Sequence, residues 1–126
     1  MSFDYLPFAN FYLAANRKAS INSIRMNIAV IGDYDLLQYK DLLQRVKMAY
    51  PDDDVLDMSR HKGSWKKNQE ARFEDICIAH LVIIGFGWRY KIEAKRDVTQ
   101  AQYIGRECFI DRDGKFLLFP QYATEI

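Results

Sequence analysis

The segment between Asn68 and Phe109 constrains the fold more than any other part of this chain. Two helix-like stretches alternate there with short apolar runs, in the order helix, buried strand, loop, helix, strand. An acidic residue, Asp75, lies in the first helix, and two more, Glu93 and Asp97, lie in the N-terminal half of the second. In an open α/β sheet such positions border the crevice at the carboxyl ends of the strands, where ligands bind. We therefore expect a site in this segment.

The preceding part of the chain continues the same alternation. Residues 26–32 (MNIAVIG) are rich in β-branched residues, which is typical of a strand buried on both faces. A helix with apolar residues at three–four spacing follows, and Asp33 or Asp35 is its expected N-cap. Residues 54–58 predict a second strand, and residues 59–67 predict a polar, basic loop that leads into the helix beginning near Asn68.

The end of the chain predicts a hairpin. The third helix, expected at residues 92–104, should end at Gly105. Asp113-Gly114, between two short apolar runs, is a strong signal for a two-residue β-turn. The whole order predicts an α/β domain with a three-layer, mostly parallel, Rossmann-like (flavodoxin-like) sheet. Helices should cover both faces, and a C-terminal antiparallel hairpin should form one edge.

We expect three parts, an N-terminal helical appendage (1–25), the α/β domain (26–120) and a short tail (121–126). After Pro7, which suits the first turn of a helix, aromatic and small residues recur at helical spacing: Phe8, Phe11, Tyr12 and Ala15. We expect this apolar face to pack against another surface, either the sheet of its own chain or a second copy of the chain. Met26 directly precedes the first strand and is an alternative start.

Composition limits the partners. A chain of 126 residues fits one domain, and a formal net charge of +1 gives no general field for a nucleic-acid polymer or a membrane surface. The longest apolar run is too short to span a bilayer, and no basic segment precedes the first apolar stretch, so we expect a cytoplasmic protein. Cys77 and Cys108 are expected to be buried thiols, because they fall on apolar faces and do not form a zinc pattern.

The turn after the first strand, Gly32-Asp33-Tyr34-Asp35, lacks the glycine patterns of dinucleotide-binding and P-loop proteins. Its two carboxylates would repel a phosphate at the following helix N-terminus, so we expect no bound NAD or ATP and no cofactor. Asp33 or Tyr34 could instead hold sugar hydroxyls. The two histidines make no convincing catalytic or metal-binding set, so we expect no metal site.

Two other side chains are candidates for ligand contacts. Trp65 lies beside lysines in the expected loop, where it could stack on a base, although packing on the nearby helix is the commoner role. Arg89, in the loop before the third helix, could contact a phosphate.

Glu93 and Asp97 are four residues apart on a helix, so their side chains share a face. Paired carboxylates in a partly dry crevice can divide labour, since one stays ionised while the other holds a proton. Cleavage of a glycosidic bond needs such a pair. The alternative is a solvated helix face with weak ion pairs to Lys95 and Arg96.

The stretch E-D-I-C-I-A-H-L-V-I-I-G, followed by the helix D-V-T-Q-A-Q-Y-I-G-R-E that begins at Asp97, resembles nucleoside 2-deoxyribosyltransferases and nucleoside 5'-monophosphate N-glycosidases. That family has an acidic residue before a strand and then a helix reading E-x-G-x-A-x-x-x-G-K-P. Ala101 and Gly105 match in place, and Arg106 stands where the Lys is expected. The resemblance implies that Asp97 is the nucleophile and Asp75 the preceding acidic residue.

The chain departs from that pattern at three places. The nucleophile position holds Asp instead of Glu, and the Asp side chain is one methylene shorter. The bulky, basic residues 88–91 (WRYK) replace a small-residue turn, and Gly32-Asp33 replaces a G-S-type turn.

The resemblance implies a nucleoside- or nucleotide-processing protein that cleaves or transfers at an N-glycosidic bond, most simply as a homodimer. A non-catalytic domain of the same fold, binding a nucleotide-derived ligand or a protein, is the alternative. The expected roles are as follows: Asp97 nucleophile or stabiliser; Asp75 or Glu93 acid or base; Gly32, Asp33, Tyr34 and Trp65 contacts to sugar or base; Arg89 contact to a phosphate.

Overall fold

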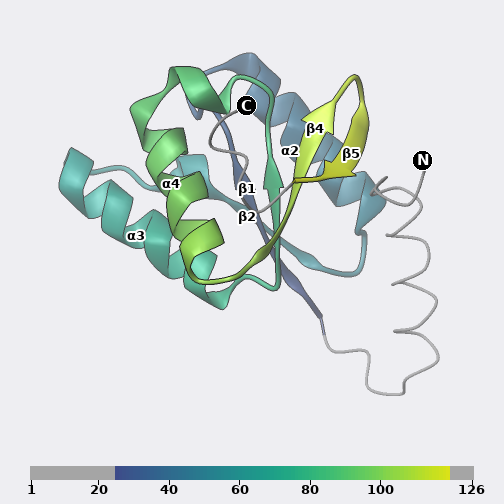
Figure 1. Ribbon diagram of the computed structural model, residues 1–126, viewed down its shortest axis with the longest axis horizontal. Coiled ribbons are helices and arrows are strands. Elements are labelled where there is room, and N and C mark those ends of the chain that lie inside the picture. Colours follow the sequence, from purple (N-terminus) through teal and green to yellow (C-terminus); the bar gives the residue numbers. More distant parts are fainter. Residues whose placement is uncertain (1–24, 120–126) are drawn as a thin grey trace.

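A computed structural model describes residues 25–119 of the chain (Figure 1). The main elements are β1 (Asn27–Ile31), α2 (Leu37–Ala49), β2 (Asp54–Asp57), α3 (Trp65–Ile78), β3 (Leu81–Ile84), α4 (Ile92–Tyr103), β4 (Glu107–Arg112) and β5 (Lys115–Leu118). Short 3-10 turns lie at Met58–Arg60 and Trp88–Tyr90. None of the helices in this range is long and apolar enough to cross a membrane. The expected helical appendage, apart from Arg25, and the expected tail lie outside the described residues.

The five strands form one sheet in the order β2-β1-β3-β4-β5 (Figure 1). The first three neighbouring pairs are parallel, and β4 and β5 are antiparallel. The turn between β4 and β5 has positive φ at Asp113 (51°) and Gly114 (79°), as a type I′ hairpin turn requires. The expected α/β fold, with a mostly parallel sheet and an antiparallel edge hairpin, is confirmed.

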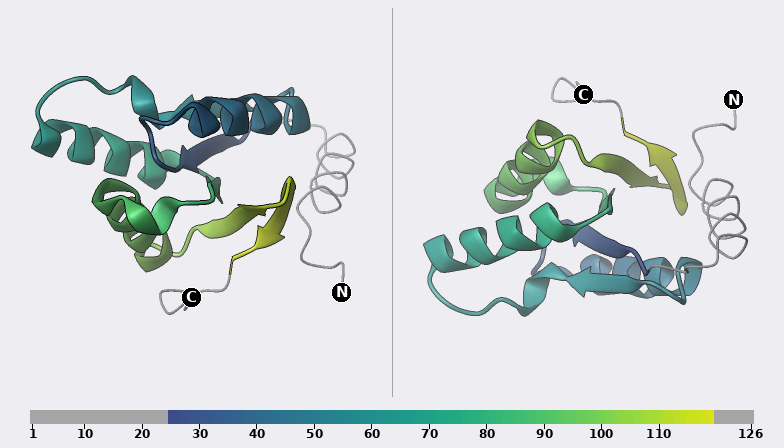
Figure 2. Two further views of the ribbon diagram at one scale, coloured as in Figure 1. Left: turned by 90° about the horizontal axis from the view of Figure 1, so that it is seen from above. Right: turned by 90° about the horizontal axis from the view of Figure 1, so that it is seen from below.

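Helices cover both faces of this sheet. Because strand side chains alternate, Ile28 and Val30 of β1 pack with α2, whereas Ala29 and Ile31 pack with α3 and α4. All four of these side chains are fully buried. Figure 2 shows α3 and α4 lying side by side, and Figure 1 shows α2 across the sheet from them. The near-continuous apolar strands β1 and β3 therefore form the centre of the core.

The starts of two helices differ from expectation. Helix α3 begins at Trp65, so the end of the expected loop is helical, because the Ser64 hydroxyl accepts a hydrogen bond from the Lys67 backbone N–H (3.3 Å) and caps the helix. Neither Asp33 nor Asp35 caps α2, whose N-cap is Leu36. The chain first makes a turn in which the Leu36 N–H donates to the Asp33 carbonyl (3.0 Å).

The expectation of two buried cysteines is half right. Cys108 is buried on β4, but Cys77 is exposed. The buried residues of α3 are Arg72, Asp75 and Ile76, which turns the position of Cys77 outward. The inward face of α3 is thus partly charged, and it carries much of the candidate site.

Candidate functional site

Strands β1 and β3 are neighbours whose outgoing connections lead to opposite faces of the sheet, to α2 and to α4. Ligands bind outside the carboxyl ends of strands at such a switch point. Gly32 and Gly85 directly follow these two strands, and the Gly85 N–H donates to the Ile31 carbonyl (2.7 Å). A Cβ on Gly85 would lie 3.7 Å from the Cα of Gly32, so bare backbone forms the tip of the sheet.

Asp97 lies at the centre of a buried polar network beside this tip. Its side chain is 1% exposed, and its Oδ2 accepts hydrogen bonds from the Tyr34 hydroxyl and from Arg72 Nε, both at 2.6 Å. The Arg72 guanidinium carbon also lies 5.0 Å from the centroid of the Tyr34 ring. The network therefore joins the loop after β1 to α3 and α4.

Burial dominates the ionisation of this network. Desolvation raises the pKa of Asp97, and the Tyr34 hydrogen bond and the Arg72 charge lower it by less. The negative charge of Glu93, one helical turn earlier, adds to the rise. Burial, followed by the charge of Asp97, also raises the pKa of Tyr34 well above its usual value, so Tyr34 is a neutral donor. A carboxyl group with a raised pKa at a switch point fits a functional site.

A second buried carboxyl group, Asp75, is paired with a histidine. Asp75 Oδ2 lies 2.8 Å from His61 Nε2, and Asp75 Oδ1 accepts a hydrogen bond from Arg60 Nη2 (2.8 Å). The histidine and arginine belong to the segment after β2, whereas Asp75 belongs to α3. This arrangement fixes the orientation of the imidazole ring, as a carboxylate does in many histidine sites.

We call the hollow beside these two groups the polar cleft. It has a volume of about 310 Å³ and lies between the loop after β1, the segment after β2 and the start of α4. Its lining residues include Asp33, Tyr34, Asp35, Ser59, His61, Lys62, Asn68, Arg72, Lys91 and Glu93. Lys91 Nζ lies 3.8 Å from Asp33 Oδ1 and 3.9 Å from Asp35 Oδ2. The polar cleft thus mixes donors and acceptors, as the recognition of sugar hydroxyls requires.

We call a second hollow, on the α2 side of the same loop, the aromatic cleft. It has a volume of about 350 Å³, and its lining residues include Gly32, Asp33, Leu36, Tyr39, Leu42, Gly85, Phe86 and Tyr90. Phe86 and Tyr90 are 75% and 84% exposed. Asp33 lines both clefts, so the loop after β1 separates them.

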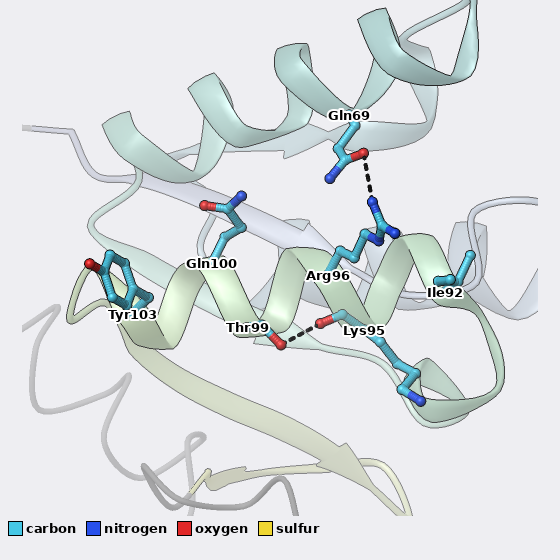
Figure 3. Close-up of a pocket in the computed structure, with 7 residues that line it drawn as sticks. All are labelled: Gln69, Ile92, Lys95, Arg96, Thr99, Gln100 and Tyr103. Atoms are coloured by element: carbon cyan, nitrogen blue, oxygen red, sulfur yellow. Dashed lines mark hydrogen bonds between the residues drawn. The ribbon is translucent and has the colours of Figure 1, made fainter.

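A third hollow lies along the outer surface of α4 and α3 (Figure 3). Figure 3 shows Gln69 and Arg96 pointing toward each other across the two helices, with Arg96 Nη1 3.5 Å from Gln69 Oε1. Ile92 and Tyr103, at opposite ends of α4, are exposed. Its two charged lining residues, Lys95 and Arg96, are both exposed, so this surface offers no buried ionisable group for catalysis.

The structure brings most of the expected site residues to the switch point. Glu93, Tyr34 and Asp33 line the polar cleft, and Gly32 lines the aromatic cleft. Asp97 and Asp75 are buried beside the polar cleft and contact its lining through Tyr34 and His61.

The other two expected ligand contacts lie outside both clefts. Trp65 is the first residue of α3, and the Arg96 guanidinium carbon lies 4.9 Å from its ring centroid. The Arg89 guanidinium carbon lies 5.7 Å from the ring of Trp88. Arg96 therefore contacts the indole of Trp65, and Arg89 contacts the indole of Trp88. The sequence around Trp65 and Arg89 did not indicate these contacts.

Three residues of the site, Arg60, His61 and Arg72, were not among those expected from the sequence. Arg72 precedes Asp75 by three residues, so the two share a helix face, and this spacing was an available signal. The contact of His61 with Asp75 spans 14 residues and depends on the 3-10 turn after β2, for which no sequence signal was available. Within residues 25–119, no group of three or more His, Cys, Asp or Glu side chains is placed to hold a metal ion.

Comparison of the chain with protein families, with curated proteins and with solved structures finds no match.

Proposed function

We propose that the protein binds a nucleoside or nucleotide in the polar cleft and cleaves or transfers its N-glycosidic bond. The observation that carries the proposal is the pair of carboxyl groups beside one cleft, Asp97 held by Tyr34 and Arg72, and Asp75 held by His61 and Arg60. Glycosidic cleavage needs two ionisable groups with different tasks, and different surroundings allow those tasks to be divided.

Asp97 is the proposed nucleophile or electrostatic stabiliser. As the bond between the sugar carbon and the base breaks, the sugar gains oxocarbenium character, and an ionised Asp97 stabilises it or bonds to it. Desolvation makes this carboxylate more basic than a solvated one. Tyr34 and Arg72 line the cleft and both contact Asp97. The proposal therefore requires the Tyr34 side chain to move aside so that a sugar contacts the carboxylate.

The His61–Asp75 pair is the proposed proton donor. The bonding electrons of the broken bond go to the departing base, which then takes a proton from His61. Asp75 holds the imidazole ring in place for the transfer. Water or a second base then attacks the sugar carbon; where Asp97 has bonded to that carbon, this bond breaks and its electrons return to the carboxylate. The proton released by the attacking group returns to His61, which completes hydrolysis or transfer. Glu93, which lines the polar cleft, is the alternative acid or base.

Chromatographic detection of free base tests this function. The full chain is incubated with a panel of nucleosides and nucleotides, and we expect base release that Asp97→Asn lowers by about 100-fold or more. Asp52→Asn makes the same chemical change at an exposed position and should leave the rate unchanged. Base release at the wild-type rate by the Asp97 variant would refute the assignment of this residue, and no release from any compound would refute the activity.

One observation favours the non-catalytic alternative, a ligand-binding domain. Asp97 Oδ2 already accepts two short hydrogen bonds, which is what a structural carboxylate also does. A rise in melting temperature with a nucleoside, without release of base, would identify this alternative. The expected homodimer and the protein-binding role of the N-terminal aromatic residues stay predictions, because those residues lie outside the described part of the chain.

A further inference from the structure

The floor and wall of the aromatic cleft are set by glycine. A Cβ added to Gly32 would lie 3.0 Å from the Tyr39 ring, and one added to Gly85 would lie 3.0 Å from Leu42 Cδ2. Both contacts would be unusually tight, so the two glycines let α2 pack closely against the tip of the sheet. Gly32 and Gly85 thus line the cleft with bare backbone, and Tyr39 and Leu42 line it with apolar side chains.

Two of the aromatic side chains that line this cleft are exposed to solvent. Phe86 and Tyr90 come from the segment between β3 and α4, line the cleft, and are among the most exposed apolar residues of the described chain. An aromatic ring exposed in this way loses its favourable burial unless something covers it. The hollow beside them, about 350 Å³, lies within the range of roughly 300–1,000 Å³ that small-molecule sites occupy.

The charges of the aromatic cleft disfavour an anionic ligand. Its lining has three carboxylates, those of Asp33, Asp41 and Asp111, against one cation, Arg45. That cation is already committed, since Arg45 Nη1 and Nη2 donate to Asp111 (2.9 and 2.8 Å) and its Nε donates to Asp41 (3.1 Å). Lys91 Nζ lies 3.8 Å from Asp33 Oδ1, so three carboxylates stand against two cations here, and a phosphate would meet one net negative charge.

We propose that the aromatic cleft binds an uncharged planar heteroaromatic ring, such as a nucleobase without a phosphate. The ring stacks on Phe86 and Tyr90 and lies over the backbone of Gly32 and Gly85, and the carboxylate of Asp33 accepts a hydrogen bond from an amino or imino group on the ring edge. This binding is independent of the bond cleavage proposed for the polar cleft.

Titration of the ¹⁵N-labelled full chain with adenine, followed by NMR, tests this inference. We expect the amide signals of Gly32, Gly85, Phe86 and Gly87 to shift in a saturable way. Because stacking of a base on an aromatic side chain contributes about 1–3 kcal/mol, Tyr90→Ala and Phe86→Ala should each weaken binding by roughly 5-fold or more. Adenosine should bind, and AMP should bind roughly 5-fold or more weakly than adenosine, since its phosphate meets a lining in which carboxylates outnumber cations.

The matched control is Tyr103→Ala, the same substitution at a tyrosine of equal exposure on the far end of α4 (87% exposed, against 84% for Tyr90). It should leave binding of adenine unchanged. The inference is overturned if adenine shifts none of the four amide signals, if Tyr103→Ala weakens binding as much as Tyr90→Ala, or if AMP binds more tightly than adenosine. It is also overturned if the same amides shift with protein concentration alone, because a second copy then covers the cleft. None of these outcomes depends on whether the polar cleft releases base. Bond cleavage in the polar cleft and ring binding in the aromatic cleft can therefore be refuted independently.

Discussion

At the scale of single residues, the Tyr34–Asp97–Arg72 network combines a structural and a chemical role. Asp97 is almost fully buried, and its neighbours are a neutral phenol and a cation. Burying a carboxylate is costly unless hydrogen bonds compensate, and here two donors do so through one oxygen. A group held in this way is oriented in advance, which is what a nucleophile or a transition-state stabiliser requires.

Tyr34→Phe should show both roles. It removes the donor to Asp97 and keeps the ring, so we expect a loss of about 1–3 kcal/mol in the free energy of unfolding at neutral pH. The Tyr34 hydrogen bond lowers the pKa of Asp97, so the variant should raise that pKa further. Urea denaturation measures the first effect, and NMR titration of the Asp97 carboxyl carbon measures the second.

The pH dependence of this loss follows from linkage. The folded-state pKa of Asp97 is raised above its usual value of 3.8, so its contribution to stability is complete below that value and is lost as the pH rises through the folded-state pKa. In Tyr34→Phe the pKa of Asp97 is higher, so this variant loses more stability than the wild type as the pH rises. The difference in the free energy of unfolding between the two proteins should therefore be smallest at low pH. Tyr103→Phe, at an exposed ring, should change stability by no more than about 0.5 kcal/mol at any pH. A gap that widens on acidification would contradict this account of Asp97.

At the scale of elements, the end of α4 shows how a local sequence signal fixes a helix that carries the site. Gly105 has φ of 80°, and the Arg106 N–H donates to the Ala101 carbonyl (2.9 Å) just beyond the last turn. This is the pattern of a helix that stops at a left-handed glycine. It was predicted from the sequence, because only the glycine following the apolar stripe of α4 fits such a position.

Gly105→Ala should lower the free energy of unfolding by about 1–2 kcal/mol, since an alanine at this φ is strained although no atom blocks its Cβ. The control is Gly63→Ala, a glycine for which the nearest neighbour of an added Cβ is Asn68 Oδ1 at 3.5 Å, an ordinary contact. Gly63→Ala should be neutral or slightly stabilising, because alanine restricts the unfolded chain. Chemical denaturation of both variants gives the comparison. Equal losses would mean that backbone strain at Gly105 is not the cause.

Sequence periodicity predicted the strands, the hairpin at Asp113-Gly114 and the extent of α4 because each depends on neighbours in the chain. The start of α3 at Trp65 was missed because it depends on one hydroxyl, that of Ser64, inside a polar run that looked like a loop. The N-cap expected at Asp33 or Asp35 was wrong because an extra turn precedes α2. A helix boundary that depends on a single side chain is harder to predict from residue periodicity than a helix with an apolar stripe.

The candidate site was predictable to the same extent. The sequence placed Asp97 next to the apolar residues Val98 and Ala101 and left a solvated helix face as the alternative, and the structure shows that Asp97 is buried with them. Its partners, Tyr34 and Arg72, come from two other elements, 63 and 25 residues away, and their contact depends on how the helices pack. The sequence therefore predicted which carboxylates belong to the site, but only the structure showed which side chains contact them.

At the scale of the whole molecule, the sheet separates two clefts of different chemistry. The polar cleft lies on the side of α3 and α4, and the aromatic cleft lies on the side of α2, with the loop after β1 between them. Tyr34, in that loop, packs against the apolar clusters of both faces. Both clefts therefore rest on the tips of β1 and β3, and their geometry depends on the rigidity of these two strands.

That dependence gives a prediction for the local stability of the chain. β1 and β3 are buried on both faces, with strand neighbours on both edges, whereas β2 and β5 are edge strands with exposed residues. Opening β1 or β3 disrupts both apolar clusters at once, so their hydrogen-bonded amides should exchange with deuterium only through global unfolding. Those of β2 and β5 should exchange faster, through local opening, although β2 is hydrogen-bonded to β1 along its length. Native-state hydrogen exchange followed by NMR measures the free energy of each opening. If β2 proves as protected as β1, burial on both faces is not what makes the tips rigid, and the two clefts must be held by the loop contacts instead.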